Sequence, residues 1–134
     1  MLTLPSTVRI YLCARPVDLR KSFDGLAAAT REVIGEDPLC GHVFVFLNRR
    51  GDRAKLLLWD RNGWLLVYKR LERGVFRSPR EPDAGAGHVL LEGPELALML
   101  EGIDLRGARR RPRWAPRSLS REGSASPIAS GSPV

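Results

Sequence analysis

The stretch Asn48–Gly74, NRRGDRAKLLLWDRNGWLLVYKRLERG, decides which fold this chain adopts. It alternates apolar blocks with turns that are rich in arginine. The dipeptide Asn62-Gly63 is a strong hairpin signal, because both central residues of the tightest turn need a positive φ, which glycine adopts freely and asparagine tolerates. Together with the apolar segment HVFVFLN before it, the stretch predicts three antiparallel strands, at 42–48, 53–60 and 64–70.

The flanking segments add further elements. The β-branched and apolar run Thr7–Ala14 predicts a first strand, and HVLLE at 88–92 predicts a short last one. A helix is expected from Asp18, as its N-cap, to Gly35, with a second, shorter helix at 93–103 that carries Pro94 in its first turn. The residues expected to face inward recur at spacings of three and four: Leu19, Phe23, Leu26, Ala27, Thr30, Val33 and Ile34 in the first helix, and Leu96, Met99, Leu100 and Ile103 in the second.

These elements predict an α+β fold in a single domain. An antiparallel β-meander sheet of about four to five strands carries one main helix packed on it and a short C-terminal helix. The compact domain is expected over residues 1–105. Residues 106–134 are expected to form a tail that is basic at first and then rich in serine, proline and glycine, a composition typical of flexible segments.

The charge of the chain points to an anionic partner. Its 134 residues carry a net charge of +7 and give a pI near 10.4. Residues 48–80 contain ten basic and three acidic groups, and the segment from Arg106 onward contains seven arginines against Glu122. The chain has no apolar run of the ~18 residues that a membrane span needs and no signal-peptide pattern, so we expect a cytoplasmic protein. Cys13 and Cys40 are expected to be buried free thiols.

The sequence contains no group of residues in the pattern of a catalytic site. Asp18, Asp24, Asp52 and Asp60 each have a local explanation as a helix cap, an exposed helix position or a turn residue. A two-metal site needs carboxylates that converge from separate elements, and the histidines are isolated. We therefore expect no catalytic residue, no metal site and no cofactor.

The basic residues are the candidates for contact with nucleic acid or with a partner protein. Their guanidinium and ammonium groups would meet phosphates along one edge of the sheet, and Trp59, Trp64 and Tyr68 among them would either stack on bases or pair in the core. The alternative is that the turns are charged only because they are solvated. The candidates are Arg49, Arg50, Arg53, Lys55, Arg61, Lys69 and Arg70 in the hairpin region, and Arg109, Arg110, Arg111 and Arg113 in a basic arm.

Four blocks of the sequence resemble the small accessory protein of insertion-sequence-66 elements, the TnpB or Orf-two type. They are PVDLRKSFDGL at 16–26, GHVFVFLNRRGDRAK at 41–55, LWDRNGWLLVYKRLERGVF at 58–76 and LALMLEGIDLRGARRRPRW at 96–114. The resemblance covers about residues 7–114, with Leu19 where methionine is usual and Ser22 where glycine is usual. It implies a role in transposition of a bacterial mobile element, beside a separate and larger transposase that carries the catalytic acidic triad.

Three hypotheses follow. The first is a non-catalytic accessory protein that helps to assemble the transposase on element-end DNA through the basic hairpin and arm. The second is a protein–protein adaptor that engages the transposase and makes no DNA contact of its own. The third is a nuclease that uses Asp18, Asp24, Asp52 and Asp60. The resemblance itself implies an accessory factor without an assigned catalytic step.

Overall fold

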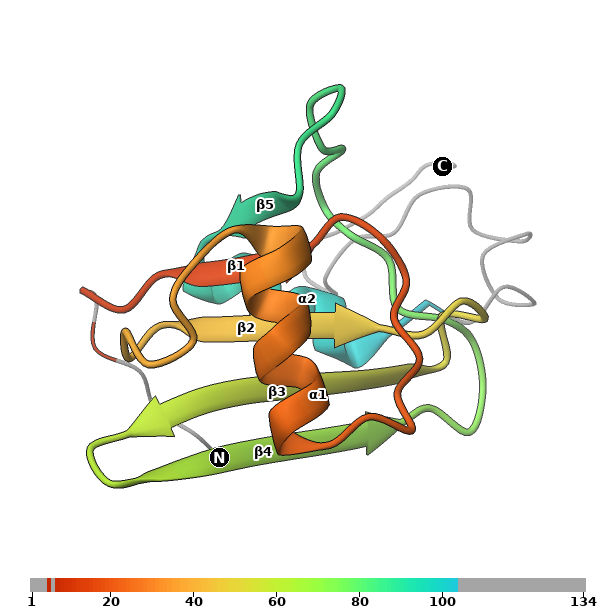
Figure 1. Ribbon diagram of the computed structural model, residues 1–134. Helices are drawn as coiled ribbons and strands as arrows, with labels where there is room; N and C mark the ends of the chain where they lie inside the picture. Colours follow the sequence, from red (N-terminus) through yellow and green to blue (C-terminus); the bar gives the residue numbers. More distant parts are fainter. Residues whose placement is uncertain (1–4, 6, 104–134) are drawn as a thin grey trace, which may run out of the picture. The chain divides into compact units, whose positions relative to one another are not determined.

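The computed structural model describes Pro5 and residues 7–103 (Figure 1). In chain order the elements are β1 (Ile10–Cys13), α1 (Phe23–Ala29), the π-helical turn η1 (Thr30–Ile34), β2 (Val43–Leu47), β3 (Arg53–Asp60), β4 (Gly63–Arg70), β5 (His88–Leu91) and α2 (Gly93–Glu101). This arrangement confirms the α+β class and its five strands. All of these elements belong to a compact unit that ends at Gly102. The expected domain boundary at 105 and the tail after it lie outside the described residues and remain predictions.

The five strands form one sheet in the order β4-β3-β2-β1-β5. The predicted meander is present, since β3 pairs antiparallel with both β2 and β4. One pairing was not expected: β1 and β2 run parallel. A parallel pair needs a crossover connection, and α1 with η1 supplies it between the two strands. The first strand of the chain therefore lies inside the sheet, with β5 antiparallel to it on its other side.

The helices cover opposite faces of the sheet, with α1 across the near face and α2 behind it in Figure 1. Successive strand residues point to opposite faces. In β2, Phe44 and Phe46 therefore pack with the α1 side, while Val43 and Val45 pack with the α2 side. All four are buried, which explains why this strand is apolar along its whole length.

The main helix begins later than predicted. The expected cap, Asp18, accepts hydrogen bonds from the Arg20 N–H at 3.0 Å and from the Arg20 guanidinium, so its carboxylate holds a turn instead of a helix end. The first helical residue is Phe23, which is 39% exposed and does not face inward as expected. Leu19 is buried, but from the turn before the helix. The predicted end is confirmed, because Gly35 has a φ of 84° and closes η1.

The predicted two-residue hairpin is confirmed, but its turn lies one residue earlier. Asp60 pairs with Gly63, so the two loop residues are Arg61 and Asn62. Arg61 has a φ of 55°, the single positive φ at a non-glycine position in the described part of the chain. Cross-strand packing accounts for the shift, because Trp59 lies opposite Trp64 with the rings edge to face at 5.0 Å and this pair fixes the register.

Of the remaining predictions, those for the last strand and the second helix are confirmed, and that for the cysteines is confirmed only in part. The short strand and the second helix are confirmed as β5 and α2; Glu92 caps α2 in a capping box with Glu95, and Pro94 lies in its first turn. Among the residues of this helix expected to face inward, Leu96 and Met99 are buried, and Leu100 and Ile103 are half-buried. The cysteines are both free, but only Cys13 is buried; Cys40 is exposed, because it lies in the loop before β2.

Candidate functional site

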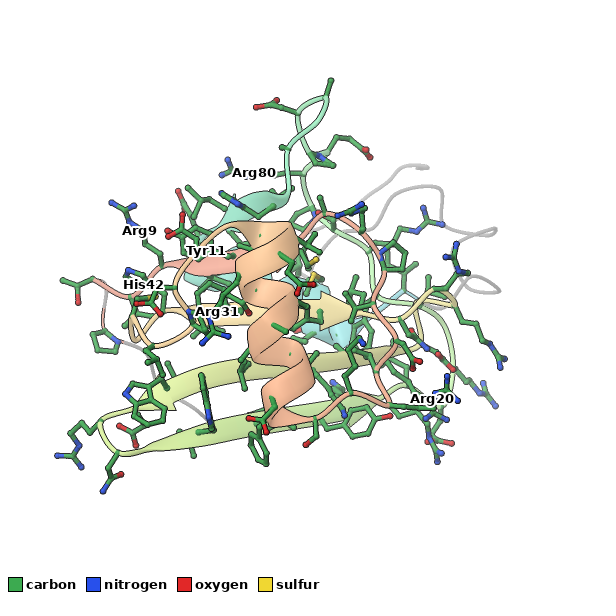
Figure 2. The ribbon with its side chains drawn as sticks, viewed as in Figure 1. Arg9, Tyr11, Arg20, Arg31, His42 and Arg80 are labelled. Carbon is green, nitrogen blue, oxygen red and sulfur yellow. The ribbon has the colours of Figure 1, made fainter. Side chains whose placement is uncertain are left out.

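A cleft of about 760 Å³ opens at the end of the sheet where β3 begins and β4 ends. The loop between β1 and α1 forms one side, and the turn between β2 and β3 forms the other. Figure 2 shows Arg20 on that loop, beside the end of β4. We call this the arginine cleft. Its lining residues are Pro16, Val17, Asp18, Leu19, Arg20, Asn48, Arg49, Arg50, Asp52, Arg53 and Tyr68.

The loop side of the cleft is tied to the sheet by two hydrogen bonds. The Val17 N–H donates to the Leu47 carbonyl at 2.9 Å. The Lys55 amine donates to the Lys21 carbonyl at 2.8 Å, from a side chain on β3 to the backbone just before α1. Because both bonds join segments far apart in the sequence, they hold the cleft open in a fixed shape.

The turn side is organised by the Asn48 carboxamide. Its Nδ2 donates to Asp52 Oδ1 at 2.7 Å, and its Oδ1 accepts from the Arg53 N–H at 3.0 Å. The hydrogen bond from Asn48, and then the charges of Arg50 and Arg53, lower the pKa of the Asp52 carboxyl and so favour its ionised form. Gly51, with a φ of 80°, lets the chain turn sharply. Arg49 and Arg50 consequently stand exposed at the tip of the turn.

Arg53 and Tyr68 meet at the sheet side of the cleft. They come from β3 and β4, and Arg53 Nη1 donates to the Tyr68 hydroxyl at 3.0 Å. The Lys55 amine lies over the Tyr68 ring, 4.6 Å from its centroid. These two contacts fix the ring in place, although 49% of Tyr68 remains exposed.

The cleft has an excess of positive charge. Four arginines and two aspartates line it. Arg20 is matched by Asp18 at 2.7 Å, and this hydrogen-bonded pair lowers the pKa of Asp18 to about 2. In the part of the chain that the structure describes, the guanidinium groups of Arg49, Arg50 and Arg53 form no ion pair with a carboxylate. Among the described residues, the guanidinium groups of Arg49 and Arg50 and the remaining N–H groups of Arg53 are therefore available to an anion.

Comparison with known proteins shows to which family this chain belongs. A sequence model of the IS66 Orf2-like proteins matches residues 8–110, a range that includes every strand and helix of the fold and all of the arginine cleft. This chain belongs to the IS66 Orf2-like family. The family is an accessory, non-catalytic one associated with the transposition of IS66 elements.

Two curated relatives come from Sinorhizobium fredii (strain NBRC 101917 / NGR234). The uncharacterized protein y4jC is 36% identical over 113 residues, which cover 84% of this chain and 94% of the relative. The uncharacterized protein y4hO is 34% identical over 116 residues, which cover 87% of this chain and 96% of the relative. No solved structure matches the chain significantly.

Within this IS66 Orf2-like chain, the structure brings together some of the predicted contact residues. Arg49, Arg50 and Arg53 line one cleft, as expected for residues close in the sequence. Arg61 lies at the opposite end of β3, roughly 26 Å away at the usual rise of a strand, beside Asp60. Arg61 therefore does not belong to the arginine cleft, because the two turns of a meander lie at opposite ends of their shared strand, and its contact with DNA or a partner stays a prediction.

The other predicted residues have different surroundings. Lys55 is only 7% exposed, and its amine is bonded inside the protein. The Lys69 amine donates to the Leu100 carbonyl at the end of α2, and Arg70 pairs with Glu72. The basic arm, Arg109, Arg110, Arg111 and Arg113, lies outside the described residues. Trp59 and Trp64 pair with each other, while Tyr68 lines the cleft.

The four carboxylates considered for metal chemistry do not converge. Asp18 and Asp52 line the cleft, whereas Asp24 lies exposed on α1 and Asp60 is at the far end of the hairpin. Among residues 7–103 no group of three histidine, cysteine or carboxylate side chains is placed to hold a metal ion. None of the described helices is long and apolar enough to cross a membrane.

Sequence reasoning did not place Arg20 and Asn48 at this site, and it named Tyr68 only together with Trp59 and Trp64, as residues that would either stack on bases or pair in the core. Arg20 and Tyr68 reach it through contacts between segments far apart in the chain, which local patterns do not report. Asn48 did carry a signal, since an asparagine followed by Asp52 four residues later is suited to closing a turn with their side chains.

Proposed function

We propose that this protein is a non-catalytic accessory factor that binds DNA in the bacterial cytoplasm through the arginine cleft, in support of an IS66 transposase. The observation that carries the proposal is the convergence of Arg49, Arg50 and Arg53 without carboxylate partners among the described residues. Guanidinium groups suit this role because their planar forks match the two oxygens of a phosphate. Family membership supplies the setting, transposition.

Salt dependence of DNA binding tests the proposal. Each phosphate that a protein neutralises releases condensed counterion, which adds about −0.9 to the slope of log affinity against log salt. Replacing Arg49, Arg50 and Arg53 together with alanine should flatten that slope by up to ~3 units, if each contacts one phosphate. The measurement is fluorescence anisotropy over a range of salt concentrations, with the full chain and an element-end duplex that carries an unpaired tail, so that phosphates can reach all three arginines.

A matched control removes the same charge from elsewhere. Arg9, Arg31 and Arg61 are exposed and do not line the cleft. Their triple replacement with alanine lowers the net charge equally, so it should leave most of the slope intact. Equal flattening by both triple variants would show a diffuse effect of net charge and would refute the cleft as the DNA site.

One observation favours the adaptor hypothesis as a second candidate. Leu65 and Val67 of the edge strand β4 are 42% and 41% exposed, and they point to the α2 face of the sheet, away from Tyr68. Exposed apolar side chains beside an open strand edge suit contact with another protein. Under this hypothesis the isolated protein has no DNA affinity at low salt, and replacing both residues with lysine abolishes capture of the transposase.

A further inference from the structure

We propose that the arginine cleft takes an unpaired nucleotide of DNA, with its base on Tyr68 and its phosphate on the surrounding arginines. This inference rests on the proposed DNA-binding function and specifies its ligand. It starts from the Tyr68 ring, which is held by Arg53 at its hydroxyl and by Lys55 over one face, yet is half exposed. An aromatic ring fixed among cationic groups is the arrangement on which single-stranded nucleic acids stack their bases.

The opposite side of the cleft suits a base as well. Pro16, Val17 and Leu19 of the β1–α1 loop line that side, beside the Asp18–Arg20 ion pair of the same loop. A nucleotide has two unlike ends, an apolar base face and a charged phosphate, and the cleft brings these apolar residues and its arginines together within one volume. That volume, about 760 Å³, lies in the range of roughly 300–1,000 Å³ found for small-molecule sites. It admits a nucleotide.

The three arginines differ in how exposed they are, and this difference distinguishes duplex DNA from unpaired DNA as a ligand. Arg49 and Arg50 stand at the exposed tip of the turn, where the phosphates of any duplex reach them. Arg53 is half-buried and bonded to Tyr68, so a phosphate contacts it only by entering the cleft. The bases of a duplex are stacked on each other and cannot cover the Tyr68 ring. Only an unpaired segment of DNA can both stack a base on the Tyr68 ring and place a phosphate against Arg53.

Binding of three DNA probes to the full chain tests the inference. The probes are a short single strand, a blunt duplex of the same sequence, and that duplex with an unpaired tail. We expect the single strand and the tailed duplex to bind about tenfold more tightly than the blunt duplex. Tyr68→Leu should remove this preference, whereas Tyr68→Phe, which keeps the ring, should retain it. Thermal unfolding of both variants verifies that they are folded.

A second measurement needs no variant. The chain has two tyrosines, and Tyr11 is only 4% exposed, so tetranitromethane should nitrate Tyr68 selectively. The single strand should protect Tyr68 from nitration, and the blunt duplex should not. Equal affinity for all three probes, with Tyr68 unprotected, would overturn the inference and leave the proposed DNA binding intact. Absence of binding to any probe at low salt would overturn both.

Discussion

Lys55 shows how a basic residue of the hairpin is used inside the protein. Burying an ammonium group costs free energy unless the group is paired. Here it donates a hydrogen bond to the Lys21 carbonyl and lies over the Tyr68 ring. We predict that Lys55→Ala lowers the free energy of unfolding by about 1–3 kcal/mol, because one long-range hydrogen bond and the packed stem are lost. Lys55→Met, which keeps the stem, should lose less. Urea denaturation measures both, and an unchanged midpoint in Lys55→Ala would contradict this role.

Asp18 gives a second prediction for a single residue. Its hydrogen-bonded pair with Arg20 lowers the pKa from the ordinary 3.8 to about 2, so the carboxylate favours the folded state when it is ionised. That contribution is present above the ordinary aspartate pKa of the unfolded chain and is lost as the pH falls towards 2. Carbon-detected NMR titration should give a midpoint near 2 in the native chain and a higher one in Arg20→Ala. The same midpoint in both proteins would show that Arg20 does not cause the shift.

At the scale of the element, the β3–β4 hairpin contains a strained residue. Arg61 adopts a φ of 55°, a left-handed conformation that costs a non-glycine residue roughly 1–2 kcal/mol. Arg61→Gly should therefore raise the free energy of unfolding by about 0.5 kcal/mol, after the greater freedom of glycine in the unfolded chain is deducted. Asn62→Gly is the matched control: Asn62 has no positive φ, so stability should fall. If urea denaturation shows Arg61→Gly to be less stable than the unaltered chain, the prediction that Arg61 is strained by its left-handed conformation is wrong.

The elements also show what local sequence patterns predict and what they do not. The strand of residues 53–60 and the hairpin after it were predictable because their signals are local. The start of α1 was missed because the Asp18 side chain bonds to the backbone two residues later and competes with a helix cap. The parallel pairing of β1 with β2 was missed because β1 is buried on both faces. Its sequence therefore has no alternation of apolar and polar residues from which a neighbouring strand could be inferred. The site divides in the same way: Arg49, Arg50 and Arg53 are neighbours in sequence, whereas Tyr68 joins them only through strand pairing.

At the scale of the whole molecule, the cleft and the basic arm are separate segments of the chain. The cleft lies within residues 16–68, whereas residues 106–134 carry seven arginines against Glu122 and few apolar residues. We predict that a chain ending at Leu105 keeps its free energy of unfolding to within about 0.5 kcal/mol, as expected when no core contact is removed. Its DNA binding should show a flatter salt slope than that of the full chain. A large loss of stability in the shortened chain would place part of the core beyond residue 105.

The position of β1 between β2 and β5 has a consequence for synthesis on the ribosome. Every residue of the cleft precedes β5 in the chain, so a nascent chain that has emerged as far as Arg80 already contains the complete site. The same nascent chain lacks His88–Leu91, the strand that covers the outer side of β1 (Figure 1). Until that strand emerges, β1 offers an apolar open edge to neighbouring nascent chains on the same messenger. Translation that stalls between these two points therefore yields a polypeptide that contains every residue of the arginine cleft but lacks the strand that protects the edge of β1.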